Sequence, residues 1–245
     1  MKRTGLILNY QNIGGEGANC LTEEQFEEQM KYLSSLNEPC LALNNLTHLD
    51  KEVNRSIFLT FDGGFRSDID IVAPILKKYN LKATFFIPAD KYDDLDPIWS
   101  YYQNLIDEGH EIGSMGFERS NFSKMNVRQQ LYAMKKSKFL LEERLNTEVD
   151  YFALPDGKFN HHTIRIASDA EYKMLFTSRF GFISLSSVPF LTKRWKMDSK
   201  VSLKMLEKVT KEDWLTLRRI KARTFVNSIV QSVFPAPVKQ QQVSA

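Results

Sequence analysis

Short runs typical of β-strands alternate with longer stretches of helical periodicity along most of this chain, and this order limits the folds that it can adopt. Each strand-like run is rich in β-branched or aromatic residues, and most are followed by a turn and then by apolar residues at helical spacing. The strand-like runs are residues 5–9, 56–61, 83–87, 111–114, 151–154 and 173–177. Because strands that alternate with helices usually pair in parallel, the pattern predicts a parallel sheet covered by helices.

The predicted helices lie between these runs and after the last of them. One begins with a capping box, Thr22-Glu23-Glu24-Gln25, and the longest covers residues 126–145, with Phe139 among its apolar positions. The others are residues 69–79, 99–108, 161–170, 202–208 and 211–233. We place one α/β domain at residues 1–200, a helical extension at 201–234 and a disordered tail at 235–245.

The composition argues against some classes of protein. The net charge of +3 is too small to indicate nucleic acid as the main partner. The apolar run at residues 6–8 is too short for a signal peptide, and no stretch reaches the length of a membrane span. We therefore expect a soluble chain; the compartment stays open, with the cytoplasm favoured. The two cysteines, Cys20 and Cys40, indicate neither a metal cluster nor a disulfide framework.

Four motifs follow one another along the predicted strands. They are Thr60-Phe61-Asp62-Gly63-Gly64, Ala83-Thr84-Phe85-Phe86, residues 109–119 (GHEIGSMGFER) and residues 151–160 (YFALPDGKFN). In this order they resemble the polysaccharide deacetylases of carbohydrate esterase family 4, and the opening Leu8-Asn9-Tyr10-Gln11 is similar to the start of exopolysaccharide-operon members. The resemblance implies a (β/α) barrel that is distorted or has fewer than eight regular strands.

The resemblance also implies a chemistry. In the family, the aspartate at the position of Asp62 is the catalytic base, and a second aspartate and two histidines hold a divalent metal, usually zinc. Such a metal acidifies a water molecule and polarises the acetamide carbonyl, while the base removes the proton during attack. Barrel enzymes place these groups at the carboxyl ends of their strands.

This chain departs from the family at the metal positions. Asp62 is retained, but the metal carboxylate position holds Gly63 and the two histidine positions hold Met115 and Arg119. The arginine that orients the base in the family is replaced by Ala153. A thioether is a soft ligand and a guanidinium is a permanent cation, so we expect no metal cofactor.

Two further expectations follow from these replacements. We predict that Arg119 pairs with Asp62 in the vacated metal site. The alternative is a metal relocated among Asp62, Glu118, Asp156, His161 and His162. It is disfavoured because the side chains of the adjacent His161 and His162 at a helix start diverge by about 100°.

Three functions are compatible with these observations. The first is a catalytically inactive barrel that serves polysaccharide assembly, beside exopolysaccharide-assembly proteins, by binding the polysaccharide in a groove. The groove residues would be Asp62, Met115, Arg119, Pro155, Asp156 and Phe159. The second is an active hydrolase of N-acetyl groups in a polysaccharide, with atypical ligands. The third is a scaffold without sugar affinity that docks through its basic terminal helix; residues 211–233 could also contact a membrane surface.

Overall fold

The structure is a computed structural model that describes residues 3–17, 19–93, 95–213, 215–220 and 222. It divides into two compact units, residues 1–203 and 204–245, which are described separately. The strands are β1 (Thr4–Tyr10), β2 (Cys40–Leu41), β3 (Arg55–Asp62), β4 (Ala83–Ile87), β5 (Glu111–Ser114), β6 (Tyr151–Ala153), β7 (Met174–Phe176), β8 (Ile183–Ser184), β9 (Leu191–Thr192) and β10 (Trp195–Lys196). The helices are α1 (Glu23–Ser34), α2 (Ala73–Lys78), α3 (Ile98–Asp107), α4 (Val127–Leu145), α5 (Thr163–Asp169) and α6 (Leu203–Thr210).

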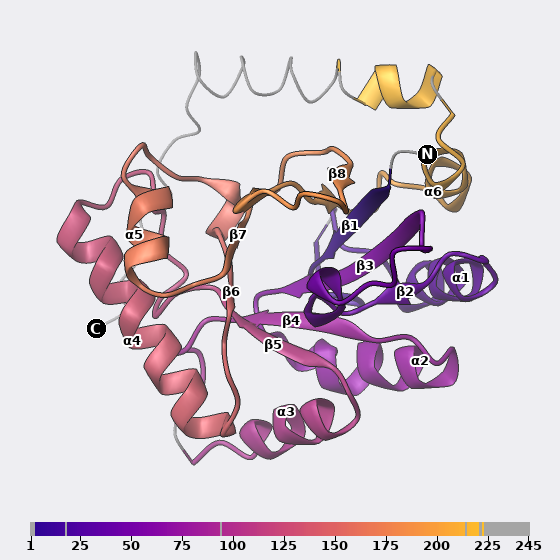
Figure 1. The fold of residues 1–245 in the computed structure, drawn as a ribbon. Coiled ribbons are helices and arrows are strands. Elements are labelled where there is room, and N and C mark those ends of the chain that lie inside the picture. Colours follow the sequence, from indigo (N-terminus) through magenta and orange to yellow (C-terminus); the bar gives the residue numbers. More distant parts are fainter. Residues whose placement is uncertain (1–2, 18, 94, 214, 221, 223–245) are drawn as a thin grey trace. The chain divides into compact units, whose positions relative to one another are not determined.

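The strands of the first unit form one sheet. Its order is β10-β1-β3-β4-β5-β6-β7-β9, with β2 beside β3 and β8 beside β1. The pairs along this order are parallel, and only the side strand β8 runs antiparallel to β1. Figure 1 shows helices α1 to α5 arranged outside the strands. The predicted distorted α/β barrel is thus confirmed, with four of its strands, β2, β8, β9 and β10, only two residues long.

The two ends of the strand order meet at a seam. Strand β9 pairs with β7 and strand β10 pairs with β1, yet only Lys193 and Arg194 separate β9 from β10 in the sequence. Backbone hydrogen bonds extend the pairing on both sides, from Thr177 to the Thr192 carbonyl (2.9 Å) and from Met197 to the Asn9 carbonyl (2.8 Å). A link of two residues therefore joins the two ends of the sheet, and the barrel is nearly closed.

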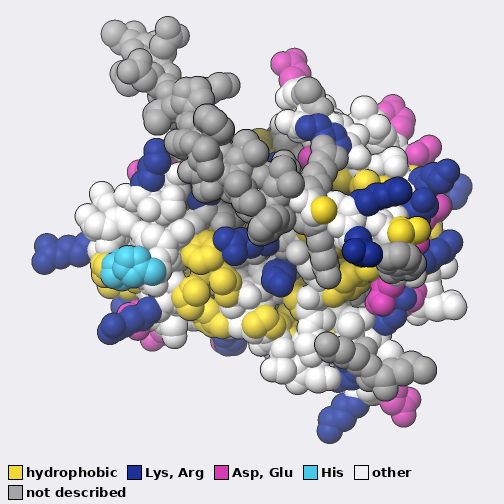
Figure 2. Space-filling model, turned by 90° about the horizontal axis from the view of Figure 1, so that it is seen from above, with side chains coloured by type: hydrophobic (Ala, Val, Ile, Leu, Met, Phe, Trp, Pro, Cys, Tyr) yellow, Lys and Arg dark blue, Asp and Glu magenta, His cyan; other side chains and the backbone are white. Residues whose placement is uncertain are grey.

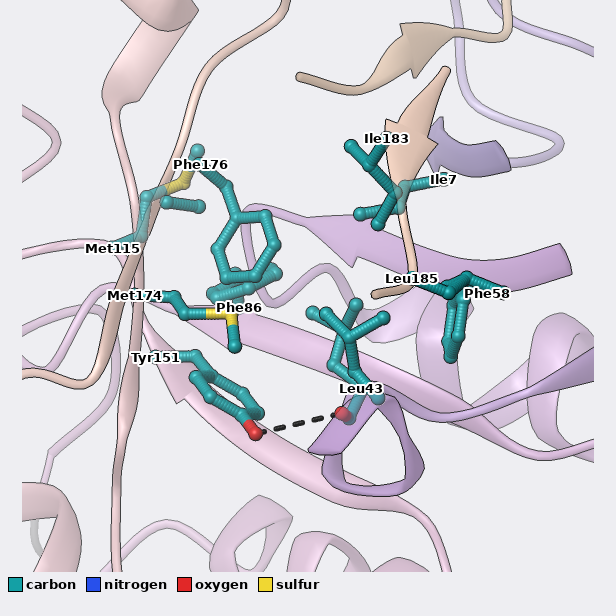
Figure 3. Close-up of a cluster of buried hydrophobic side chains, with 12 residues drawn as sticks. Ile7, Leu43, Phe58, Phe86, Met115, Tyr151, Met174, Phe176, Ile183 and Leu185 are labelled. Carbon is teal, nitrogen blue, oxygen red and sulfur yellow. Dashed lines mark hydrogen bonds between the residues drawn. The ribbon is translucent and has the colours of Figure 1, made fainter. Parts of the chain in front are cut away.

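The barrel interior follows from the alternation of side chains along each strand. On β3, Phe58, Thr60 and Asp62 occupy alternate positions and therefore share one face, as do Ile7 and Asn9 on β1. Figure 3 shows the apolar part of this interior, where the Tyr151 hydroxyl donates to the Leu43 carbonyl (3.4 Å). The cluster consists of Ile7, Leu43, Leu46, Phe58, Phe86, Met115, Tyr151, Ala153, Met174, Phe176, Ile183 and Leu185. On the same face, Asp62 is the last residue of β3 and Asn9 the next to last of β1, so both lie at the carboxyl end of the barrel.

Most predicted elements of the first unit are confirmed to within a few residues. The capping box of α1 forms as expected, with the Thr22 side chain accepting from the Gln25 backbone and the Gln25 side chain accepting from the Thr22 backbone. The single helix predicted at residues 69–79 is instead a π-helical turn, Asp68–Val72, followed by α2. Strands β2, β8, β9 and β10 were not predicted, because two residues are too few to show a periodic pattern.

In the second unit, Leu206 and Val209 of α6 are buried, and residues 215–220 are helical. The Asp213 carboxylate accepts hydrogen bonds from the backbone and the hydroxyl of Thr216 (3.0 and 2.5 Å). The helix predicted at 211–233 is thus described only in part, and the tail predicted at 235–245 lies outside the described residues. In the part of the chain that is described, no helix combines the length and the apolar character needed to cross a membrane.

Candidate functional site

The carboxyl end of the barrel is organised around a buried ion pair between Asp62 and Arg194. Asp62 is the last residue of β3, and its two carboxylate oxygens accept from the two amino groups of Arg194 at 2.6 and 2.8 Å. A third hydrogen bond comes from the Asn9 amide (3.0 Å). Asp62 is 4% exposed and Arg194 is 0% exposed. This is the bidentate geometry in which guanidinium–carboxylate hydrogen bonds are strongest.

The remaining contacts of Arg194 hold its guanidinium across the seam. Its Nε donates to the Thr177 carbonyl just after β7 (3.2 Å), and one amino group also donates to the Thr60 hydroxyl on β3 (3.2 Å). The guanidinium carbon lies 5.1 Å from the centre of the Phe86 ring, within range of a cation–π contact. One side chain therefore connects β3, β4 and the residue that follows β7.

The prediction that Arg119 pairs with Asp62 is wrong. Arg119 is exposed and lies 3.5 Å from the Asp156 carboxylate instead. With the Gln11 side-chain oxygen turned toward it, both amino groups of Arg119 also donate to Gln11 (2.5 and 2.8 Å). Arg194 takes the place beside Asp62 that was expected for Arg119. The sequence does not indicate this role, because Arg194 lies between two strands that are too short to be recognised.

Gly63, at the position that the resemblance assigns to the metal carboxylate, lies in a tight turn beside a lysine. Gly63 has a φ of 108°, and a Cβ atom at this position would collide with the Phe65 ring. The Gly63 carbonyl accepts from the Lys91 ammonium (2.7 Å), which also lies 3.9 Å from the centre of the Phe65 ring. Glycine is favoured here because other residues rarely adopt this φ. A carboxylate side chain at position 63 would therefore need a rearranged turn.

The two histidine positions diverge from each other. Met115 is 1% exposed and packs in the core beside Phe176, as Figure 3 shows, so its predicted place in a ligand groove is wrong. Arg119 points its charge to the surface instead. Burial lowers the pKa of Lys91; the charge of Asp68 acts in the opposite direction and that of Arg119 in the same direction, so the two cations lie close enough to interact.

The residues present do not fit a divalent metal. A glycine, a core methionine and an arginine stand at the positions that the resemblance assigns to the ligands, and Arg194 already binds the Asp62 carboxylate. Across the described ranges, no group of three or more His, Cys, Asp or Glu side chains could hold a metal ion. His161 and His162 are exposed, with ring centres 3.7 Å apart, and belong to no such group. Figure 2 shows histidine side chains at the surface near α5.

The other predicted groove residues are partly brought together. Asp156 is exposed, has a φ of 55°, and lies between Arg119 (3.5 Å) and Lys158 (3.8 Å). Phe159 is half-buried, with the Arg179 guanidinium 5.6 Å from its ring centre. Pro155 is buried beneath this segment and offers a ligand no surface. Arg119, Asp156 and Phe159 therefore remain as candidate ligand contacts; we name this group, with Gln11, the mouth cluster.

A second carboxyl group lies buried behind the glycine turn. Burial raises the pKa of Asp68 to about 8, and the charge of Asp62 acts in the same direction, whereas Lys91 lowers it. One Asp68 oxygen and the Tyr102 hydroxyl are buried without a hydrogen-bond partner in the structure. Desolvation makes the charged form of a buried carboxyl costly, so Asp68 is expected to be protonated at neutral pH.

With the barrel and its carboxyl end described, comparison with known proteins gives the family. The family model for polysaccharide deacetylases matches residues 50–175, and the chain belongs to this family. Among curated proteins, it is 25% identical over 183 residues to YxkH of Bacillus subtilis, covering 73% of this chain and 66% of YxkH. It is also 26% identical over 178 residues to the poly-β-1,6-N-acetyl-D-glucosamine N-deacetylase of Staphylococcus aureus, covering 64% of this chain and 60% of that enzyme. The chain thus spans slightly less than two thirds of these relatives.

Solved structures share the fold. The deacetylase PplD of Streptococcus pyogenes, determined in complex with acetate, has a TM-score of 0.74 at 20% identity, over 85% of this chain and 98% of PplD. The polysaccharide deacetylase BC0361 of Bacillus cereus has a TM-score of 0.75 at 20% identity, over 84% of this chain and 69% of that structure. The resemblance found in the four sequence motifs is therefore confirmed.

Proposed function

We propose that this chain binds an N-acetylated polysaccharide at the carboxyl end of its barrel without hydrolysing it, as a binding subunit in exopolysaccharide assembly. The observation that carries the proposal is the combination at the former catalytic centre. Asp62 is retained but held by Arg194, while Gly63, Met115 and Arg119 stand at the three positions of the metal ligands.

The energetic argument concerns the attacking water. A bound metal lowers the pKa of water by about 9 units, which corresponds to about 12 kcal/mol of easier hydroxide formation. No side chain at the former metal positions supplies a comparable field. A cation such as Arg119 or Lys91 would repel a divalent ion by roughly 6–7 kcal/mol at about 5 Å and an effective dielectric constant of about 20. Catalysis by the family's route is therefore unfavourable here.

The binding part of the proposal depends on the mouth cluster. Arg119, Gln11 and Asp156 present hydrogen-bonding groups, and the half-buried Phe159 ring follows Asp156 three residues later in the same loop. Sugar recognition combines hydrogen bonds to hydroxyl and acetamide groups with apolar contact to a ring face, and this cluster offers both. The S. aureus relative acts, by its name, on poly-β-1,6-N-acetyl-D-glucosamine, so oligomers of that sugar are the first ligands to test.

Two measurements test the two halves of the proposal. Acetate release from N-acetylglucosamine oligomers should stay at background with and without added zinc, and calorimetry should detect their binding. Arg119→Ala with Phe159→Ala should abolish the binding. Arg55→Ala is a matched control, because Arg55 pairs with Glu38 (3.4 Å) at the opposite end of β3.

The outcomes separate the three candidate functions. Zinc-dependent acetate release that disappears in Asp62→Asn would overturn the inactive assignment and identify a hydrolase. An absence of binding to every oligomer would overturn the glycan-binding assignment and leave the scaffold hypothesis.

A further inference from the structure

The solvent-facing side of α4 exposes aromatic and aliphatic side chains among cations. We name this row the α4 stripe; it consists of Val127, Arg128, Leu131, Tyr132, Lys135, Lys136 and Phe139. The positions recur at intervals of three and four residues, so they lie along one side of the helix. Tyr132 is 59% exposed, Phe139 63% and Val127 45%. At 1.5 Å per residue, the stripe extends over about 18 Å.

The stripe is not needed to fold the helix. The opposite side of α4 supplies the core with Ala133, Met134 and Leu141, which are at most 5% exposed. Phe139, one of the apolar positions of the predicted helix, is therefore exposed and does not belong to the core. Single exposed apolar residues are common, but a continuous exposed row is a feature of binding surfaces.

The stripe is continuous with the loop that carries Arg119 of the mouth cluster. The Phe117 ring, two residues before Arg119, lies 6.4 Å from the Tyr132 ring in an edge-to-face arrangement. The Lys136 ammonium lies 3.6 Å from the centre of the Phe117 ring and 5.3 Å from that of Tyr132. Phe117, Tyr132 and Lys136 thus connect the Arg119 loop to the helix.

The charge of the stripe is positive. Arg128, Lys135 and Lys136 are its charged members, and Lys136 interacts electrostatically with Asp90, which also lies within range of Glu118. Within the part of the chain that the structure describes, Arg128 and Lys135 form no ion pair. Glu143, one turn beyond Phe139, marks the end of the positive region. An anionic partner therefore complements this surface along most of its length.

We propose that the α4 stripe binds the continuation of an acidic polysaccharide whose chain enters at the mouth cluster. This inference rests on the proposed function and adds the substrate class: a polymer with carboxylate or phosphate groups. Tyr132 and Phe139 are seven residues apart, about 10.5 Å along the helix, so each ring can contact the apolar face of a different sugar. The three cations then pair with the acidic groups. A single row of contacts that leads away from a binding loop suits a polymer strand better than a flat membrane.

The test compares long and short ligands on one pair of variants. Tyr132→Ser with Phe139→Ser removes the stripe rings, and Tyr101→Ser with Ile164→Ser is the control, because these residues are 40% and 39% exposed on α3 and α5. The probes are long oligogalacturonates, which are acidic, and short neutral N-acetylglucosamine oligomers. We expect the stripe variant to bind the long acidic probe at least about tenfold more weakly than the unchanged chain does, and to bind the short neutral probe with the same affinity. The control variant should bind both probes as the unchanged chain does.

The outcomes distinguish this inference from the proposed function. Unchanged affinity of the stripe variant for the long acidic probe would overturn the inference. So would stripe-dependent binding to vesicles that contain phosphatidylglycerol without binding to the acidic probe. The short neutral probe could fail to bind while the acidic probe still binds in a way that depends on the stripe. This result would overturn the proposal that the mouth cluster binds neutral glycans and would leave the stripe as the glycan site.

Discussion

Replacement of Arg194 by methionine should destabilise the barrel strongly. The substitution leaves the Asp62 carboxylate, 4% exposed, with the Asn9 amide as its remaining hydrogen-bond donor. It also removes the hydrogen bonds to Thr60 and to the Thr177 carbonyl. Removal of one partner from a buried ion pair typically costs about 3–5 kcal/mol. We expect a decrease of this size in the free energy of unfolding, and a decrease of roughly 10 °C in the melting temperature.

A double-mutant cycle isolates the pair itself. Asp62→Asn and Arg194→Met are measured separately and together, and the coupling between two contacting residues is typically about 0.5–3 kcal/mol. We expect the double variant to be more stable than Arg194→Met alone, because no unpaired carboxylate remains buried. Urea unfolding can be followed by tryptophan fluorescence, since Trp195 is 5% exposed next to Arg194. A loss below about 1 kcal/mol in Arg194→Met, or strictly additive effects, would refute the reasoning.

Three further predictions concern other residues. The pKa of Asp68 is raised to about 8 from 3.8, so the folded state keeps a proton that the unfolded state loses, and the free energy of unfolding should fall as pH rises from about 4 to about 8. In urea titrations at pH 8, Asp68→Asn should be more stable than the unchanged chain, and equal stability of the two would contradict the assignment. Gly63→Asp should destabilise the chain by about 1–3 kcal/mol and should not restore zinc binding, which elemental analysis of the purified variant checks; one zinc per chain would be the contrary result. Asn126→Ala should cost about 1 kcal/mol in urea unfolding through loss of the α4 cap, whereas Asn121→Ala, in the preceding loop, serves as the comparison.

The fold could be predicted from the sequence because its signals are local. Strands β1, β3 and β4 are continuous apolar or β-branched runs, and the caps of α1 and α4 are formed by residues within one turn. Such signals need no information about distant parts of the chain. The short strands β8 to β10 form only by pairing with partners far away in the sequence, so their existence depends on the completed barrel.

The candidate site could be predicted only in part for the same reason. Asp62 is visible in the motifs, and the structure places it at the carboxyl end of the barrel as expected. The partner of Asp62 is not visible, because Arg194 lies 132 residues away in a segment without periodicity. Charge complementarity pointed to the wrong arginine, since the sequence contains many and does not show which one faces inward.

The two-residue link at the seam has a consequence for how this protein aggregates when it is destabilised. An open sheet of parallel strands would present two unpaired edges, with backbone amides and carbonyls available to strands from other molecules. In this barrel the strand order ends at β10 and β9, the short strands on either side of Lys193 and Arg194, which pair with β1 and β7. Loosening of this link would uncover both edges at once, so a destabilised seam is expected to favour self-association before complete unfolding.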